Sequence, residues 1–67
     1  MRRWLKEQRV LHDLTQAQMA KRLEITESYY SYIESGERQK RLDITLVSKL
    51  SAIFNLPIQQ IVKFEEE

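Results

Sequence analysis

The sequence predicts an all-α fold, a compact bundle of five short helices, from its composition and its helix-start signals. Leu, Ile, Lys, Glu and Gln are abundant, whereas glycine and proline occur once each, and this composition favours helices. No stretch alternates apolar and polar residues as a half-buried strand does, and no Asn-Gly pair indicates a hairpin. Preferred N-cap residues precede helically spaced apolar residues at several points. The 67 residues are therefore expected to form one helical domain.

The first expected helix covers residues 2–12, which contain no helix-breaking residue. Leu5 is expected to face the core. Trp4 is expected to cover the domain with a partly exposed ring, or to enter a dimer contact, in preference to stacking on a base. Arg2 and Arg3 are expected to lie on a solvated face, with contact to nucleic-acid phosphates as the alternative.

The second expected helix begins after Thr15, because Thr is a preferred N-cap and Gln18, three residues on, can complete a capping box. Its inward face consists of Met19, Ala20 and Leu23, which follow helical spacing. Since Ala20 is small and central on this face, a second helix can cross closely there.

The third expected helix follows a break of two residues and is capped by Thr26. Tyr30 and Ile33 recur at helical spacing and form its inward face. The helix is expected to end at Gly36, the only glycine in the chain, because a left-handed residue after a helix is least costly without a Cβ.

The fourth expected helix is capped by Asp43 and presents one continuous apolar stripe to the core. The stripe consists of Ile44, Val47, Leu50 and Phe54.

The fifth expected helix follows Pro57, because proline suits the first turn of a helix. It carries more apolar surface than a small domain buries easily by itself, so part of it is expected to form a two-fold dimer contact. The residues expected there are Ile58, Ile61, Val62 and Phe64. The acidic residues 65–67 are expected to form a frayed tail after a domain of residues 1–64.

A set of residues in the first half of the chain agrees jointly, in order and spacing, with a known family. These residues are Arg9, Leu14-Thr15-Gln16, Met19-Ala20, Leu23, Ile25, Ser31, Ile33-Glu34 and Gly36. Residues 5–54 thus resemble the helix-turn-helix domains of the phage repressor, Cro and Xre type, which implies a lambda-repressor-like fold and binding to double-stranded DNA. The family usually has glycine in the turn, where this chain has Glu24, and a non-glycine residue at positive φ is strained.

The resemblance also implies roles for individual residues. Gln16 resembles the family's phosphate-contacting residue at the start of the first motif helix. Arg9 and Glu34 resemble its partly buried ion pair. The residues that fall at the base-reading positions of the second motif helix, the recognition helix, are Glu27, Ser28 and Tyr32.

Three tyrosines occur within four residues of the recognition helix, and they cannot all point inward. Tyr30 is expected in the core. Tyr32 then lies with Ser28 on the exposed side, where an aromatic ring beside small polar groups suits the major groove. The alternative is a plain solvated face.

Three basic residues follow the recognition helix within residues 37–42, namely Arg38, Lys40 and Arg41. A loop at this place could lie along the sugar-phosphate backbone, so these residues are expected to contact phosphates and set the register on the duplex. The alternative is ordinary soluble surface.

Composition excludes or disfavours several other functions. Cysteine is absent and histidine occurs once, so neither a disulfide framework nor a zinc site is expected. No Gly-rich phosphate loop and no nucleophile beside a base occurs, so no enzyme activity, cofactor or small-molecule substrate is expected. No apolar run approaches the roughly 20 residues that cross a bilayer and no signal core follows the N-terminal arginines, so we expect a cytosolic protein without membrane contact.

The sequence therefore predicts a DNA-binding transcription regulator, a homodimeric repressor that occupies a palindromic operator. The net charge is +1 and residues 65–67 are all acidic, so the rest of the chain is modestly basic, as suits a polyanionic partner. The alternative is a protein-interaction module, such as an antitoxin or anti-repressor partner, whose exposed tyrosines bind a protein groove.

Overall fold

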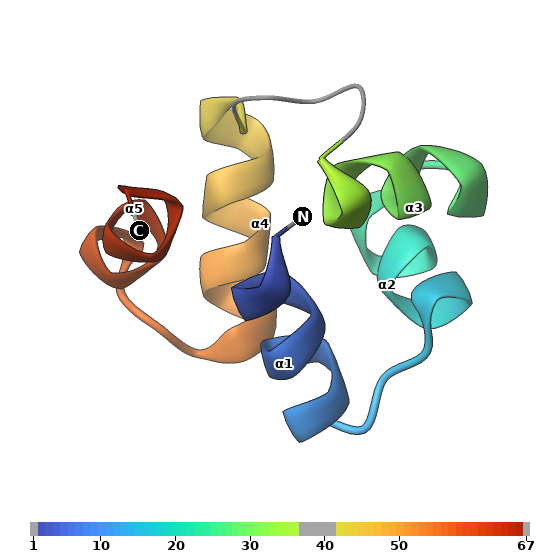
Figure 1. Cartoon of the computed structure of the whole chain (residues 1–67), viewed down its shortest axis with the longest axis horizontal. Coiled ribbons are helices and arrows are strands. Elements are labelled where there is room, and N and C mark those ends of the chain that lie inside the picture. Colours follow the sequence, from blue (N-terminus) through green and yellow to red (C-terminus); the bar gives the residue numbers. More distant parts are fainter. Residues whose placement is uncertain (1, 37–41, 67) are drawn as a thin grey trace.

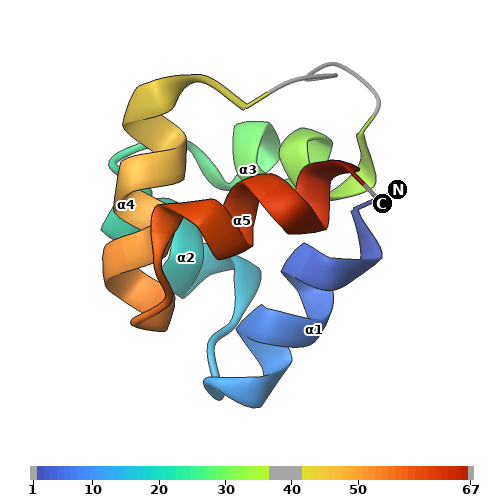
Figure 2. The same cartoon turned by 90° about the vertical axis from the view of Figure 1, so that its left-hand side faces the viewer.

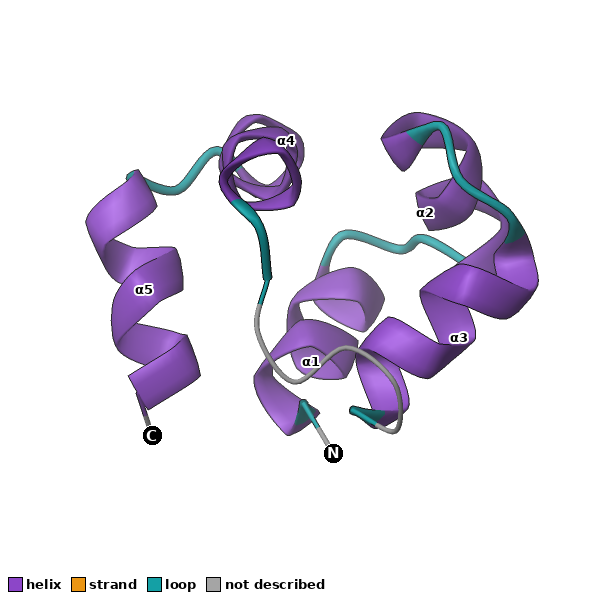
Figure 3. Cartoon of the chain, turned by 90° about the horizontal axis from the view of Figure 1, so that it is seen from above, coloured by secondary structure: helices purple, strands orange, loops and turns teal. Residues whose placement is uncertain are grey.

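A computed structural model describes residues 2–36 and 42–66, and within them it contains five α-helices and no strand (Figure 1). The helices are α1 (Arg3–Leu11), α2 (Gln16–Leu23), α3 (Glu27–Ser35), α4 (Ile44–Phe54) and α5 (Ile58–Glu66). Seen from above, α2 and α3 lie on one side, α4 and α5 lie on the other, and α1 lies between them (Figure 3). The predicted all-α fold is confirmed.

Helices α2, α3 and α4 begin where N-cap side chains satisfy free backbone donors. Thr15 Oγ1 accepts from the Gln18 amide at 3.1 Å, and Gln18 Oε1 accepts from the Thr15 amide at 2.8 Å, which completes the predicted capping box. Thr26 and Asp43 cap α3 and α4, each by accepting from the amide three residues further on. Because each cap spans only three residues, the sequence encodes these helix starts locally.

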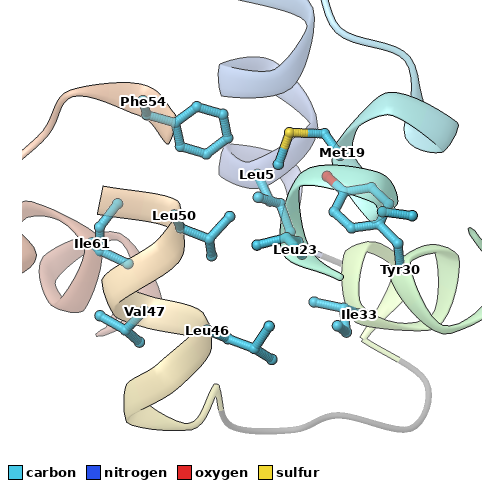
Figure 4. Close-up of a cluster of buried hydrophobic side chains, with 11 residues drawn as sticks. Leu5, Met19, Leu23, Tyr30, Ile33, Leu46, Val47, Leu50, Phe54 and Ile61 are labelled. Carbon is cyan, nitrogen blue, oxygen red and sulfur yellow. The ribbon is translucent and has the colours of Figure 1, made fainter. Parts of the chain in front are cut away.

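The core receives buried side chains from all five helices (Figure 4). The largest fully buried side chains are Tyr30, Leu5, Met19, Leu23, Ile33, Leu50 and Ile61. One predicted core position is wrong, because Ile44 is 72% exposed and Leu46 is buried in its place. Ile44 is the first residue of α4, and the residues that this helix buries are Leu46, Val47, Leu50 and Phe54.

Helix α5 divides its apolar residues between the core and the surface. Ile61, predicted at a dimer contact, is 0% exposed within the single chain, so that prediction is wrong for this residue. Phe64 is half-buried because its ring stacks on Trp4, with ring centroids 5.2 Å apart. Ile58 and Val62 remain 41% and 45% exposed.

The expected frayed tail is wrong at Glu65 and Glu66, both of which belong to α5. Glu65 is fixed because its carboxylate accepts hydrogen bonds from the side chains of Arg2 and Trp4. Within residues 2–36 and 42–66, no helix has both the length and the apolar character that crossing a bilayer requires.

Candidate nucleic-acid interface

Helices α2 and α3 pack against each other across a tight turn. Glu24 ends α2 in the left-handed conformation, with φ 60° and ψ 40°, and its amide donates to the Lys21 carbonyl at 3.1 Å. This is the strained non-glycine position that the sequence predicts. Lys49 of α4 donates to the carbonyl of Leu23 at 3.2 Å, so a cation holds the C-terminal end of α2 from outside the motif.

A shallow depression lies where the start of α2 meets the outer face of α3. Its lining consists of Gln16, Glu27, Ser28, Ser31 and Tyr32. The fold thus brings the predicted base-reading residues together with the predicted phosphate contact at the start of α2. Ser31 received no predicted contact, although it lies four residues after Glu27 and three after Ser28, a spacing that puts all three on one helix face. Helical periodicity alone would therefore have placed Ser31 on this face.

Behind this depression, Arg9 and Glu34 form the predicted ion pair. Arg9 Nε and Nη2 donate to the Glu34 carboxylate at 3.0 and 3.3 Å, and the Glu34 side chain is only 5% exposed. Arg9 Nη1 also donates to the Leu14 carbonyl at 2.8 Å, which ties α1 to the start of the motif. Gln16 Nε2 lies 3.5 Å from the same carboxylate, so its side chain reaches from the surface back to the ion pair.

The same charges act on Tyr30, whose ring is buried beside the pair. Hydrogen bonding to Glu34 raises the pKa of Arg9 above its usual value, and burial only partly opposes this shift. Burial, followed by the nearby Glu34 carboxylate, raises the pKa of Tyr30 well above its usual value. Within the described part of the chain, the Tyr30 hydroxyl has no hydrogen-bond partner of acceptable geometry. The phenol is therefore held neutral beside a charged pair.

The predicted phosphate contacts in the loop after α3, Arg38, Lys40 and Arg41, lie outside the described residues. Phosphate contact by Arg2, the alternative considered from sequence, is wrong. Its side chain is buried and bonded to Glu65, so it does not face solvent.

Lys6 adds a cation to the neighbourhood of the recognition helix. It is exposed on α1 and lines a second depression together with Ser31 and Ser35 of α3. The sequence alone does not indicate this position of Lys6, because the contact between α1 and α3 is not visible in local spacing. In the described ranges, no group of three or more His, Asp or Glu side chains could hold a metal ion.

The comparisons with known proteins agree with this geometry. A profile of the helix-turn-helix family matches residues 5–61, which is more than half of the chain and extends from within α1 to the first turn of α5, with both motif helices inside it. Searches among curated proteins and among solved structures found no match. The two capped helices, the turn between them and the profile match together show that the chain belongs to the Cro/C1-type, Xre-like helix-turn-helix family of DNA-binding transcription regulators.

Proposed function

We propose that this protein reads a specific site on double-stranded DNA by placing α3 in the major groove. The observation that carries the proposal is the exposed depression in which Glu27, Ser28 and Tyr32 meet Gln16. In B-DNA the major groove admits an α-helix, and a residue at the N-terminus of α2 can reach the flanking phosphate.

Each proposed base contact has a chemical rationale. The Glu27 carboxylate can accept a hydrogen bond from cytosine N4, the Ser28 hydroxyl can donate or accept, and the Tyr32 ring can pack on a thymine methyl. We assign Gln16, Arg38, Lys40 and Arg41 to phosphates, where they set register and supply affinity without sequence information.

We further propose that the protein acts as a homodimeric repressor. The exposed apolar pair Ile58 and Val62 on α5 supports a two-fold contact, which buries them against the same residues of a second copy. Two recognition helices about 34 Å apart would then read a palindromic operator on one face of the duplex. Occupying that site is sufficient to exclude polymerase.

Selection of bound sites from a random DNA pool, followed by titration of single-base variants, tests this function. Tyr32→Ala should change preference at individual positions by about 1–3 kcal/mol. Lys40→Ala is the matched control, because losing one phosphate contact should weaken all sites alike and reduce the salt slope by about one unit. A uniform loss with Tyr32→Ala would refute base reading by this face. A weak salt dependence of partner binding would instead favour a protein-interaction module.

A further inference from the structure

Arg2 joins three separate parts of the fold, although it lies next to the N-terminus. Its Nε lies 3.0 Å from the Glu65 carboxylate at the end of α5. Its Nη1 donates to the Ile33 carbonyl at 2.7 Å, and its backbone amide donates to the Glu34 carbonyl at 2.8 Å. We propose that Arg2 and Glu65 are positioning residues that hold the C-terminal end of the recognition helix in its reading geometry, an inference that rests on the proposed function.

The two carbonyls that Arg2 binds are groups that α3 cannot satisfy itself. The last four carbonyls of an α-helix have no amide of the same helix four residues further on. Ile33 and Glu34 are among them, because α3 ends at Ser35 and the Gly36 amide already donates to the carbonyl of Tyr32. A cation at this end also interacts favourably with the negative end of the helix dipole. Arg2 therefore anchors the end of α3 to the start of α1.

Glu65 acts on α3 through Arg2. Its carboxylate accepts from Arg2 Nε and, at 2.8 Å, from Trp4 Nε1, and the Trp4 ring stacks on Phe64. In Figure 2 the end of α5 lies on the same side of the molecule as the start of α1 and the end of α3. With this carboxylate removed, the Arg2 guanidinium loses its charged partner in a mostly buried place, and its hold on the Ile33 carbonyl weakens.

The position of this contact determines which part of the recognition face depends on it. The N-terminal end of α3 is fixed by the Thr26 cap and by the turn to α2. Tyr32 precedes the anchored Ile33 directly, whereas Glu27 lies five residues earlier, or about 7.5 Å along the axis at 1.5 Å per residue. A tilt of α3 about the turn moves Tyr32 further than Glu27. Losing the Arg2–Glu65 contact should therefore reduce the protein's preference for particular bases at the positions that Tyr32 recognises.

The test compares Glu65→Gln, which keeps the size and an acceptor oxygen but removes the charge, with Val47→Ala. Val47 is a core residue of α4, so its truncation lowers stability without touching the contact. At a temperature where both variants are fully folded, Glu65→Gln should bind the selected operator about three- to tenfold more weakly. Its preference should fall at the base pairs that Tyr32→Ala identifies and persist at those that changes of Glu27 identify. Val47→Ala should lower the melting temperature and keep the wild-type preference.

Amide hydrogen exchange provides a readout that needs no DNA. The Gly36 amide donates to the Tyr32 carbonyl at 2.8 Å, so it reports whether the end of α3 is closed. Faster exchange at Gly36 in Glu65→Gln, but not in Val47→Ala, supports the proposal. Wild-type base preference together with wild-type exchange in Glu65→Gln would overturn it. If the wild-type protein shows no preference for any duplex, the proposed function fails, and exchange at Gly36 alone decides whether Glu65 positions α3.

Discussion

Glu34 is a buried carboxylate whose charge is balanced by several donors at once. Arg9 donates to both of its oxygens, and Gln16 approaches one of them. Such compensation is needed because taking an isolated carboxylate out of water costs several kcal/mol. The pair therefore fastens α3 to α1, and it also holds Gln16 at the rim of the proposed DNA-binding face.

Arg9→Ala should lower the free energy of unfolding by about 1–3 kcal/mol, since Glu34 would remain buried with too few donors. Chemical denaturation measures this change. Arg22→Ala is the matched control, because Arg22 lies exposed on α2 and should have little effect. An unchanged midpoint for Arg9→Ala would mean that the ion pair contributes no net stability.

Tyr30→Phe should make the protein less sensitive to alkaline pH. Burial raises the pKa of Tyr30 in the folded chain above its unfolded value of about 10, so the folded state binds more protons at high pH. This contribution to stability is fully present below pH 10 and is lost as pH rises above it. Urea unfolding at successive pH values should show a steeper decline for the wild type than for Tyr30→Phe.

At neutral pH, Tyr30→Phe should keep or slightly raise stability, since it removes a buried hydroxyl without a partner among the described residues. A loss of more than about 1 kcal/mol at neutral pH would indicate that the hydroxyl does bond to Glu34.

The turn between α2 and α3 sets the angle at which the recognition helix leaves its partner. Glu24 adopts a left-handed conformation there, and such a conformation costs a residue with a Cβ about 1–2 kcal/mol. The turn persists because both helices bury apolar faces on either side of it, and because Lys49 holds the end of α2. Packing thus imposes a backbone geometry that the residue itself disfavours.

Glu24→Gly should raise the free energy of unfolding by about 0.5–1 kcal/mol, because glycine adopts this φ without steric cost. Thermal or urea unfolding can detect this increase. Ala52→Gly, at an exposed position within α4, should destabilise by a similar amount, since glycine lowers helix propensity there. If Glu24→Gly also destabilised the protein, the strain energy at Glu24 would be smaller than the free-energy cost of the extra entropy that glycine gives the unfolded chain.

The molecule as a whole exposes apolar groups on more than one face. The side chains of Ile58 and Val62 are exposed on α5. Those of Val10 and Leu11 are exposed on a different helix, α1. Only the α5 pair belongs to the contact expected from sequence, and Ile61 between them is a core residue of the single chain. A substitution that tests the dimer must therefore avoid Ile61, because a charge there would unfold the monomer.

Val62→Asp should weaken the proposed homodimer, because two buried carboxylates would face each other across the two-fold axis. Analytical ultracentrifugation at tens of micromolar, with and without operator DNA, measures the association. Val10→Asp is the matched control, as it makes the same change on α1, and it should leave association intact. A wild type that stays monomeric on its operator would contradict the dimer. Loss of association with Val10→Asp alone would assign the contact to α1.

By itself, the sequence determined the features that depend on neighbours three or four residues away. The caps at Thr15, Thr26 and Asp43 and the glycine stop after α3 involve only local backbone groups, so they were predictable. The exposed side shared by Ser28 and Tyr32 follows from helical periodicity for the same reason. Glu27 was placed with them by the family resemblance. The Arg9–Glu34 pair was found because the family resemblance supplies a contact that spacing does not.

Only the tertiary structure decided which side of each helix is covered and which distant residues meet. Ile61 is buried and Val62 exposed, although both are apolar and adjacent, because α5 packs against α4 with only one side of the helix. Arg2 and Glu65 are 63 positions apart, so their contact exists only after all five helices have packed. Local propensity contains no information about such pairs, since bringing them together depends on the sum of core contacts along the intervening chain.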